Sequence, residues 1–594
     1  MALDLEDAYN RVQYDTLMRT LVSMGITPEL IVWIGEAMLK RTVAMRLGTW
    51  ASGACTITPG LPQGSALSPV LFNVYTVGIT ANQLSGPGRT LSFADDGLAY
   101  RTGKERQAIA DSVQEELDRI GTWCEENNGK IHPGKASVLW CSLNNRAVKE
   151  EMPEVSINGQ PIKRDDTLRY LGIVLDRTLC GKEHISRVIT KARRGLNAVK
   201  VMASDRMPQT ALVLMFDMLV ISQIEYGFGI LTLSSTQIKR LEVIQNEGMR
   251  AVLGCTKDTS AAAMRHVLGL PNMEERHKLA QVKSFLKVCA DPKHPLHGKV
   301  GRQVESRLKR GTEWMTQAAQ TIEECGLSVE AIRKGEAWVA TTDGYRDSYT
   351  KVVATLGREC REWPEAATEA EIQTLIEENC RVDETLIYTD GSVQRGVKSG
   401  WAFTASCQGR CKQERAGATG LTTSSMCMEV KAITEALKWL SSSGEEYATF
   451  LTDSKSTLDK IQGGRLYADW LTSISSSDLR RLQWIFCPGH AGVIGNERAD
   501  ELAGTAVIGG ELKLDGPTVL RIVRDHLASR REEESFTKDL LIEKGVQYGE
   551  GRKSSMRDPT RRYTNQMMME TISMYTLRWT LLKRSEGVWV NPSQ

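Results

Sequence analysis

The stretch TLSFADDGLAY (residues 90–100) holds two adjacent aspartates, Asp95 and Asp96, between two apolar runs. The apolar runs predict two strands, and the break between them predicts a β-hairpin with both carboxylates at its tip. Two carboxylates held this close repel each other, and divalent cations are the usual means of keeping both ionised. Taken alone, the pair is also typical of a solvated turn, which is the commoner case. Its meaning therefore depends on the rest of the chain.

Two further motifs precede this hairpin. The stretch LDLEDAY (residues 3–9) predicts a strand that carries Asp4 and runs into a helix. The stretch GLPQGSALSP (residues 60–69) is a turn marked by Gly and Pro that opens an apolar helix. An aspartate on a strand, a Pro-Gln-Gly loop and an aromatic-Ala-Asp-Asp hairpin, in this order, resemble the palm of reverse transcriptases. The resemblance is closest to non-LTR retrotransposons of the jockey and I-factor kind.

The resemblance assigns roles to the residues of these motifs. It implies that Asp4 and Asp95 bind two Mg²⁺ ions, for which Mn²⁺ could substitute, with Asp96 in support. The ions would activate the primer 3′-hydroxyl and stabilise the leaving pyrophosphate. Tyr9 would close the sugar pocket against a 2′-hydroxyl and so select deoxynucleoside triphosphates. The implied nucleotide and template contacts are Leu5, Gln63, Gly64 and Lys135, although a solvated turn lysine is the alternative for Lys135.

Length and composition limit the classes of protein that the chain can represent. With 594 residues it is too long for one hydrophobic core, and two to four domains are expected. The formal net charge is only +2, so contact with nucleic acid depends on local basic faces rather than on a global field. The 13 cysteines include no Cys-x-x-Cys pair, which predicts reduced thiols in an intracellular protein and no zinc site.

No targeting or membrane signal is visible in the sequence. The N-terminus lacks the pattern of a signal peptide. The most apolar long run, residues 211–233, is interrupted by Asp217, Gln223 and Glu225. We therefore expect a soluble protein without a membrane partner.

The position of Asp4 is unusual for a reverse transcriptase, because only three residues precede it. Family members carry a fingers region before this point, which grips the template, and many carry an endonuclease further upstream. The resemblance therefore predicts a truncated element that lacks both. An upstream polypeptide could supply the fingers and the endonuclease.

The middle of the chain is predicted to be mostly helical. An apolar stripe predicts a helix over residues 104–127, and residues 169–174 resemble the hairpin that holds the primer end in these polymerases. We assign residues 1–180 to the palm, 181–290 to a helical thumb and 291–383 to a connection. The thumb carries a basic face, suited either to a duplex backbone or to solvent: Arg187, Lys191, Arg193, Arg194 and Lys200.

A second set of acidic residues follows the connection. Asp390 ends a predicted strand in YTDGS (residues 388–392), and Asp453 follows another strand, ATFLT (residues 448–452). Glu429 lies at the start of an apolar-striped helix, and Asp500 ends the stretch CPGHAGVIGNERAD (residues 487–500). Strand ends and helix starts can bring carboxylates together at one edge of a sheet. Four such groups can hold two divalent cations for in-line phosphodiester cleavage.

The ordered set of Thr-Asp-Gly-Ser, Thr-Asp-Ser and Pro-Gly-His-x-Gly resembles type 1 ribonuclease H over residues 384–504. The resemblance implies an α/β fold with a mixed five-stranded sheet and four metal-binding acids, Asp390, Glu429, Asp453 and Asp500. It also implies that His490 assists proton transfer or product release, although a structural loop histidine is the alternative. The expected substrate is an RNA/DNA hybrid, recognised through its backbone and 2′-hydroxyls.

Residues 505–594 are interpreted as a polar, basic tail. The tail has a cluster of cationic residues: Arg552, Lys553, Arg557, Arg561 and Arg562. This cluster could hold nucleic acid, but disorder is the favoured interpretation. Cys487 is the last cysteine of the chain, so the tail has no zinc knuckle.

Together these patterns predict an α+β multidomain protein with a palm, a helical thumb and connection, and a ribonuclease H domain. The predicted function is RNA-directed DNA polymerisation with hybrid cleavage, using an RNA template, a DNA primer and deoxynucleoside triphosphates. Two alternatives remain: only the ribonuclease H is active because the fingers are missing, or the chain is a non-catalytic remnant that binds nucleic acid. Residence in the nucleus and cytoplasm is expected from the resemblance alone.

Overall fold

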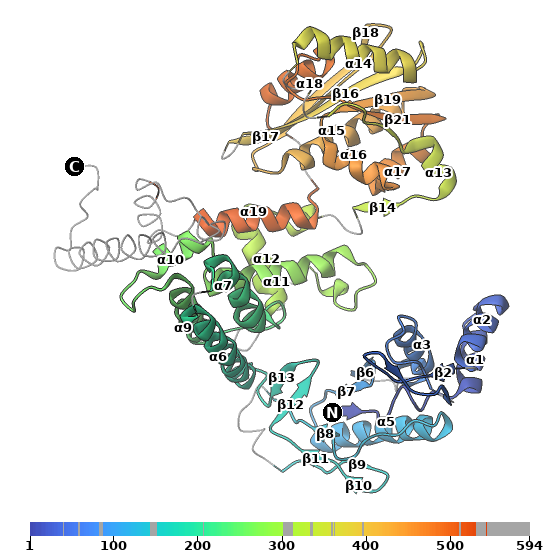
Figure 1. Ribbon diagram of the computed structural model, residues 1–594, viewed down its shortest axis with the longest axis vertical. Coiled ribbons are helices and arrows are strands. Elements are labelled where there is room, and N and C mark those ends of the chain that lie inside the picture. The colour runs from blue at the N-terminus through green and yellow to red at the C-terminus, as the bar shows by residue number, and fades with distance from the viewer. Residues whose placement is uncertain are drawn as a thin grey trace. The chain divides into compact units, whose positions relative to one another are not determined.

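The computed structural model describes residues 1–39, 41–57, 60–81, 87–142, 151–205, 207–300, 313–332, 337–357, 360, 363–394, 397–509, 513–529 and 542. The chain divides into two compact units, which are labelled by element in Figure 1. The first unit comprises residues 1–194 and 233–237, and the second comprises residues 195–232 and the chain from 238 onward. The predicted domain boundaries at 180, 290, 383 and 504 stay predictions.

A five-stranded sheet lies at the centre of the first unit, in the order β11-β8-β1-β7-β6. Its strands are β1 (Ala2–Asp4), β6 (Gly88–Phe93), β7 (Asp96–Arg101), β8 (Ser137–Val138) and β11 (Lys163–Arg164). The predicted hairpin is formed by β6 and β7, in which Phe93 pairs with Asp96. Strand β1 pairs antiparallel with β7 and places Asp4 opposite Asp96. Two motifs far apart in the sequence are therefore neighbours in one sheet.

Helix α5 (Arg106–Glu126) packs against this sheet and agrees closely with the helix predicted over 104–127. Its apolar stripe is buried in one cluster with residues of β1 and β7: Val113, Leu117, Ile120, Cys124, Leu3 and Ala99. Burial of each large apolar side chain contributes about 1.5–3 kcal/mol. The buried Glu116 accepts a hydrogen bond from Thr90 Oγ1 at 2.6 Å and pairs with Arg101 at 2.9 Å. Helix α5 thus holds both strands of the Asp-Asp hairpin.

Three further helices of the first unit surround a second core: α1 (Tyr14–Ser23), α2 (Pro28–Leu39) and α3 (Ser68–Tyr75). Helix α4 (Val77–Ala81) instead contributes Ile79 to the core under α5. The predicted helix from Tyr9 begins only at Tyr14, because Asp7 has a left-handed backbone with φ 55° and the next residues form turns. Short strands β2 (Arg41–Val43), β3 (Arg46–Leu47), β4 (Trp50–Ala51) and β5 (Cys55–Ile57) lead to the Pro-Gln-Gly loop.

A hairpin follows α5 at the position that the sequence predicts. Strands β12 (Thr167–Tyr170) and β13 (Ile173–Asp176) pair antiparallel, with Tyr170 opposite Ile173. Both turn residues have positive φ, 46° at Leu171 and 82° at Gly172. Positive φ at both positions defines a type I′ turn, whose twist suits a two-residue hairpin. A smaller hairpin precedes it, formed by β9 (Ser156–Ile157) and β10 (Gln160–Pro161).

The predicted thumb region is helical throughout its described residues, apart from connecting turns. Its helices are α6 (Lys182–Ser204), α7 (Gln209–Phe216), a π-helical segment (Asp217–Ile221), α8 (Ser222–Glu225), α9 (Ser235–Leu253), α10 (Ala261–Leu268) and α11 (Met273–Ala290). Helix α12 (Trp314–Glu324) follows. The five predicted basic residues of α6, from Arg187 to Lys200, are all exposed to solvent.

The apolar run 211–233 is helical only as far as Glu225. Its α7, π-helical segment and α8 follow one another directly, and turns come after them. Val220, Ile221 and Ile224 from this run are buried in the protein. Among the described residues, no helix is both long enough and apolar enough to cross a membrane.

A mixed six-stranded sheet dominates the second unit, in the order β15-β21-β19-β16-β17-β18. The five expected strands are β16 (Thr385–Gln394), β17 (Lys398–Cys407), β18 (Arg410–Thr419), β19 (Tyr447–Thr452) and β21 (Arg481–Phe486). The predicted mixed sheet of five strands within residues 384–504 is confirmed. Strand β15 (Lys351–Val353) adds a sixth, because Val352 pairs in parallel with Trp484 at the sheet edge.

Helices cover both faces of this sheet. Helices α15 (Ser425–Leu440), α16 (Lys455–Gln462) and α17 (Ala468–Ser475) share one core with Phe450 and Trp484. Helices α14 (Glu365–Asn379) and α18 (Ile494–Thr505) share the other core with Leu451 and Ile485. Adjacent strand residues thus point to opposite cores, as the two-residue repeat of a strand requires.

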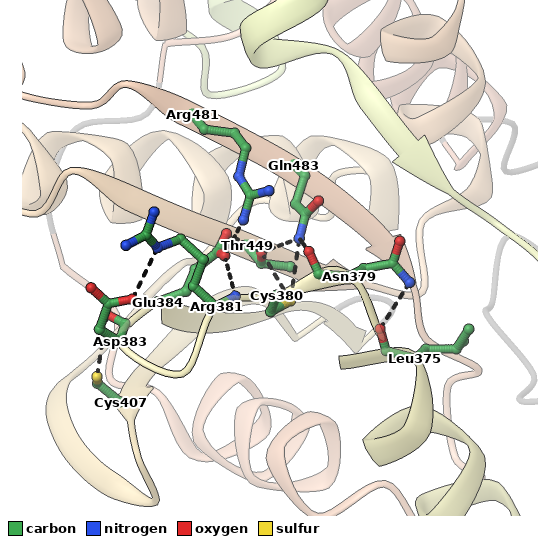
Figure 2. Close-up of polar contacts among 10 residues, drawn as sticks. All are labelled: Leu375, Asn379, Cys380, Arg381, Asp383, Glu384, Cys407, Thr449, Arg481 and Gln483. Carbon is green, nitrogen blue, oxygen red and sulfur yellow. Dashed lines mark hydrogen bonds and ion pairs between the residues drawn. The ribbon is translucent and has the colours of Figure 1, made fainter. Parts of the chain in front are cut away.

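Figure 2 shows a polar network where the parallel strands β16, β19 and β21 begin. Glu384 accepts a hydrogen bond from Thr449 Oγ1 at 2.7 Å and pairs with Arg481. Gln483 Nε2 donates to Thr449 Oγ1 at 2.9 Å and to the backbone oxygen of Asn379 at 3.0 Å. The network attaches the end of α14 to the sheet. The opposite ends of the same strands carry the predicted acids.

Residues outside the predicted ribonuclease H range complete the second unit. Strand β14 (Trp338–Ala340) pairs with β20 (Arg465–Tyr467), and α13 (Asp343–Tyr349) follows it. Helix α19 (Gly516–Ser529) lies in the stretch predicted to be a polar tail, yet its Val519, Val523 and Leu527 share a core with α11 and α12. The predicted basic cluster, residues 552–562, lies outside the described residues.

Candidate active sites

Three aspartates come together at the end of the first unit's sheet. Asp4 and Asp96 are directly opposite each other in β1 and β7. Asp95 lies in the turn after Ala94, whose backbone is left-handed with φ 51°. The Leu5 amide donates to the Asp95 carbonyl at 3.1 Å, so the turn is tied to the chain just after Asp4. The structure thus brings the three residues together at one end of the sheet, but their carboxylate oxygens do not all lie within 4.8 Å of one another.

Lys135 lies beside these acids. Its Nζ is 2.9 Å from Asp4 Oδ2, and this contact raises the pKa of the Lys135 ammonium. The His132 amide donates to the Asp4 carbonyl at 2.9 Å, which brings the turn containing Lys135 close to β1. The structure therefore adds an observation that the sequence did not provide: Lys135 is a counter-charge for the carboxylates.

Burial raises the pKa of the Asp96 carboxyl, and the charges of Asp95 and Asp4 raise it further. Arg169 and Lys135 oppose this shift. Arg169 lies in β12, next to Tyr170, whose pKa is raised by burial and by Asp96. Sequence reasoning identified this hairpin but did not single out Arg169, because only the folded chain brings it near Asp96.

The predicted nucleotide and template residues occupy the surroundings of this centre. The Tyr9 ring stacks on Phe72 of α3 with 4.8 Å between ring centroids, and its carbonyl accepts from the Leu61 amide at 2.8 Å. Tyr9 is therefore tied to the start of the Pro-Gln-Gly loop. Gln63 and Gly64 are exposed in that loop, where Gly64 has φ 94°. Leu5 is half-buried and packs against both apolar cores of the unit.

The second centre is formed by Asp390, Glu429 and Asp453, whose carboxylate oxygens lie within 4.8 Å of one another. Strand β16 pairs in parallel with β19, with Thr389 opposite Thr452, so Asp390 and Asp453 both follow this pair. Glu429 comes from the second turn of α15. The structure therefore brings together three of the four acids that the sequence predicts, from three separate elements.

Glu429 is fixed by hydrogen bonds to both neighbouring strands. Its Oε1 accepts from the Gly391 amide at 2.8 Å, and its Oε2 accepts from Thr452 Oγ1 at 3.2 Å. Gly391 has no room for a side chain, since a Cβ there would lie 2.6 Å from the Glu429 amide nitrogen. The Gly of the Thr-Asp-Gly-Ser motif thus allows α15 to approach β16 closely.

The electrostatics of this centre differ from those of an exposed acid cluster. Burial raises the pKa of Asp390 to about 7, and the charges of Asp453 and Asp500 add to the effect. Burial also raises the pKa of Glu429, with further contributions from Asp390 and Asp453. Buried, like-charged carboxylates hold protons unless a cation compensates them.

Asp500 and His490 complete the predicted set. Asp500 lies on α18 and hydrogen-bonds to Asp390, while His490 Nδ1 is 3.4 Å from Asp500 Oδ2. His490 has φ 53°, and its side chain is 75% exposed. The preceding residue, Gly489, is close to the centre, because a Cβ there would lie 2.1 Å from Asp453 Oδ2. The histidine therefore lies on a narrow loop beside the acids.

Glu497 is a residue near this centre that sequence reasoning missed. Its carboxylate groups with His490 and Asp500 within 4.8 Å, and it accepts from the Gly492 amide at 3.2 Å. The sequence could have indicated Glu497, because it lies three residues before Asp500 and residues three apart share one helix face. Its contact with Gly492 indicates that it orients the loop that carries His490.

Both centres suit divalent cations. Their donors are carboxylate oxygens, which Mg²⁺ and other hard cations prefer. In the second centre three of these donors converge within 4.8 Å, and burial raises the pKa of Asp390 and of Glu429. A bound cation would stabilise the ionised carboxylates and so oppose both shifts.

Two family models match the chain. A model described as reverse transcriptase (RNA-dependent DNA polymerase) matches residues 1–175, and a model described as RNase H matches residues 383–508. The first range contains Asp4, Asp95 and Asp96, and the second contains Asp390, Glu429, Asp453 and Asp500. Both predicted domains are thereby confirmed.

Curated relatives match the chain in part. The probable RNA-directed DNA polymerase from transposon X-element of Drosophila melanogaster is 28% identical over 262 residues, which cover 43% of this chain and 28% of that protein. The RNA-directed DNA polymerase from mobile element jockey of Drosophila funebris is 25% identical over 261 residues, which cover 42% of this chain and 28% of that protein. The match therefore spans under a third of each relative's length.

Solved structures also match. An N-terminal RNase H domain from Mycobacterium tuberculosis is 20% identical, with a TM-score of 0.18, and covers 21% of this chain and 98% of that chain. A foamy viral protease-reverse transcriptase in complex with RNA/DNA hybrid is 13% identical, with a TM-score of 0.20. The match covers 85% of this chain and 66% of that chain. The family models and the curated relatives agree with the motifs of both centres. The chain therefore carries a reverse transcriptase domain and an RNase H domain, and it is similar to the RNA-directed DNA polymerases of non-LTR retrotransposons.

Proposed function

We propose that this chain copies RNA into DNA and cleaves the RNA strand of RNA/DNA hybrids, with one carboxylate centre for each reaction. The observation that supports the proposal is the assembly of two separate acid clusters from residues distant in the sequence. Asp4 joins Asp96 across two strands, and Asp390, Glu429 and Asp453 lie within 4.8 Å. Each cluster lies inside the range of the matching family model.

In the polymerase centre, Asp4 and Asp95 would hold Mg²⁺, or Mn²⁺ as a substitute, and Asp96 would support them. In the ribonuclease centre, Asp390, Glu429, Asp453 and Asp500 would hold the same ions. Two divalent cations in such a site supply Lewis acidity, which activates the attacking oxygen and stabilises the leaving oxygen. The protein's own part is to keep the carboxylates in place through Gly391, Thr452 and the Leu5 amide.

The side chains around the polymerase centre would select the substrates. Tyr9, held by its stacking on Phe72, would exclude a 2′-hydroxyl and thereby favour deoxynucleoside triphosphates. Gln63 and Gly64, in their exposed loop, would contact the template, and Leu5 would line the nucleotide side. Lys135 would move from Asp4 toward the triphosphate when a cation replaces it as the counter-charge. RNA template and DNA primer are the partners.

In the ribonuclease centre, His490 would carry a proton between Asp500 and solvent. The 3.4 Å contact with Asp500 and the 75% exposure of the imidazole support this role, since the ring reaches both the acids and water. Histidine suits the task because its ordinary pKa is near neutrality. The expected hybrid recognition uses backbone and 2′-hydroxyl contacts, which predicts cleavage with little sequence preference.

The cellular setting follows from the same proposal. A retrotransposon polymerase meets its RNA in the cytoplasm and its DNA target in the nucleus, so we place the chain in both compartments. An upstream polypeptide that carries fingers and an endonuclease is a proposed partner. Imaging of the tagged chain with and without such a partner would test both statements.

The experiment that tests the proposed function uses one labelled RNA/DNA primer-template and the full chain. With Mg²⁺ present, the proposal predicts both primer extension and RNA cleavage on the same gel, and neither in EDTA. Cleavage without extension would limit the function to the RNase H domain. Binding of the primer-template with neither reaction would contradict both enzymatic assignments.

A further inference from the structure

The second unit contains a cavity of about 710 Å³ beside α15. Its walls come from the RNase H helices α15, α16 and α17 and from segments outside the matched RNase H range, namely Trp338 of β14 and residues 513–521 of α19 and its approach. The Thr518 side chain hydrogen-bonds to Cys427, which joins α19 to the first turn of α15. Helix α19 thus closes one side of the cavity.

Cationic side chains predominate among the charged groups that line this cavity. Five cations face two carboxylates, Asp469 and Asp515, and the cations are Lys431, Lys438, Lys460, Lys513 and Arg521. Asp515 is partly engaged elsewhere, because it accepts from the Thr518 amide at 3.0 Å at the start of α19. For a chain whose formal net charge is only +2, this is a marked local excess of positive charge.

The lining cations differ in whether the protein compensates them. Lys431 and Lys438 both pair with Glu435 at 2.8 Å. Lys460, Lys513 and Arg521 form no ion pair with a carboxylate in the part of the chain that the structure describes. The Arg521 Nε is buried and has no acceptor among those residues. The charge of Asp515 acts on Lys460 without forming an ion pair, and the net positive charge of these three lining cations favours an anionic ligand.

The remaining lining suits the rest of a nucleotide. Trp338 and Tyr467 contribute aromatic rings, with 5.4 Å between their centroids, and Lys460 Nζ lies 4.5 Å above the Trp338 ring. The hydroxyl groups of Thr472 and Ser473 add donors and acceptors, whereas that of Thr434 already donates to the Val430 carbonyl at 2.6 Å and accepts from Trp470 Nε1 at 2.9 Å. Aromatic rings beside cations are the usual platform for a base and its phosphates. The volume also lies within the range of cavities that hold small ligands, about 300–1,000 Å³.

We propose that this cavity binds a nucleoside phosphate, with the phosphates on Lys460, Lys513 and Arg521 and the base toward Trp338 and Tyr467. The ligand is either a free nucleotide or one unit of a nucleic-acid strand. The site is separate from both carboxylate centres, and it does not require either of them to be active. It makes the segments that flank the RNase H domain part of a binding site rather than a linker and a tail.

The test measures binding of labelled dATP to the full chain by equilibrium dialysis in EDTA, where metal-dependent binding at the carboxylate centres is absent. The wild type should bind dATP, and inorganic tripolyphosphate should compete for the site. The double substitution Lys513→Gln with Arg521→Gln should weaken binding about 10-fold or more, because each charge-assisted contact is lost. The single substitution Lys513→Gln, at an exposed residue, should show a smaller loss in a chain whose fold is undisturbed.

Two control variants make the result specific. Lys412→Gln removes a lysine of β18 that pairs with Glu445 and does not line the cavity, and it should leave binding unchanged. Asp95→Ala disables the polymerase centre and should also leave binding unchanged. A hexamer of deoxyadenylate then identifies the source, since tighter binding than dATP assigns the site to a strand and equal binding assigns it to free nucleotides. Absence of dATP and hexamer binding by the wild type, or equal binding by the double variant, would overturn the proposal even if hybrid cleavage is intact.

Discussion

The two carboxylate centres of this chain both bring like-charged groups together, but they differ in burial and in the cations beside them. In the first unit, Asp95 and Asp96 are exposed, and the Lys135 ammonium lies 2.9 Å from Asp4. In the second unit, Asp390 is only 7% exposed and Glu429 only 1%, and the largest contributions to their pKa shifts are burial and neighbouring acids. Without a metal, a carboxyl in each centre has a raised pKa, but in the first centre the nearby cations Arg169 and Lys135 oppose the rise. In the second centre burial and neighbouring acids raise the pKa of Asp390 to about 7.

Burial and nearby charge together set how strongly a carboxylate centre holds protons before a cation binds. A cation entering the first centre would replace Lys135 as the counter-charge of Asp4, whereas a cation entering the second centre would displace protons. The two centres should therefore respond differently to pH, to substitution and to metal, although both are built from carboxylates.

The largest effect is expected from removal of one acid in each centre. Asp453→Asn should reduce hybrid cleavage at least about 10³-fold and leave primer extension unchanged, because several kcal/mol of metal-assisted stabilisation are lost. Asp95→Ala should do the reverse. A single gel with labelled primer and labelled RNA reads both reactions, and equal loss of both activities in either variant would show that the centres are not independent.

A smaller effect is expected from Gly489→Ala. The added Cβ would lie 2.1 Å from Asp453 Oδ2, so the carboxylate has to move. Displacement of a group that positions the reacting atoms typically costs about 10²-fold in rate. Hybrid cleavage should fall by that factor while thermal unfolding changes little. Gly504→Ala in α18 is the matched control, because a Cβ at Gly504 meets nothing within 4 Å.

Lys135→Gln should reduce primer extension about 10-fold, because a favourable charge interaction at the centre is lost. Lys135 lowers the pKa of Asp96, so its removal should also shift the pH profile of extension toward higher pH. Lys135→Arg should restore most of the rate, because the charge is retained. A variant with an unchanged pH profile would place Lys135 outside the centre.

The last effect concerns the stability of the second unit without metal. The pKa of Asp390 is raised from 3.8 to about 7, so the folded state holds a proton that the unfolded state releases. This contribution is complete below pH 3.8 and is lost as pH rises toward 7. Between pH 4.5 and 7.5 the second unit should lose roughly 2–4 kcal/mol of stability in EDTA. Asp390→Asn should lack that pH dependence in thermal unfolding, and a wild type with the same slope as the variant would contradict the assignment.

Much of both centres could be predicted from the sequence, because their acids are marked by local motifs. The Asp-Asp hairpin, the helix over 104–127 and the four ribonuclease acids depend on short-range patterns, and the structure places them as expected. An acidic residue at the end of an apolar strand can be recognised from a few neighbouring residues in the sequence. The fold then had only to bring the strand ends together.

Other features depend on contacts between distant residues, which no local pattern reveals. Strand β15 has three residues, and only its pairing with β21 defines it. Helix α19 has an ordinary amphipathic pattern, but its partners α11 and α12 lie about 200 residues earlier in the chain. Arg169 likewise lowers the pKa of Asp96 only because the folded unit brings the two residues close together.

The contrast between the two centres is tested most directly by counting the protons released when Mg²⁺ binds. Calorimetric titrations at pH 6.5 in two buffers of different ionisation enthalpy give this number, with Asp95→Ala isolating the second centre and Asp453→Asn isolating the first. We predict release of about one proton at the second centre, where the pKa of Asp390 is about 7, and far less at the first. Equal proton release at the two centres, or none at the second, would contradict the account.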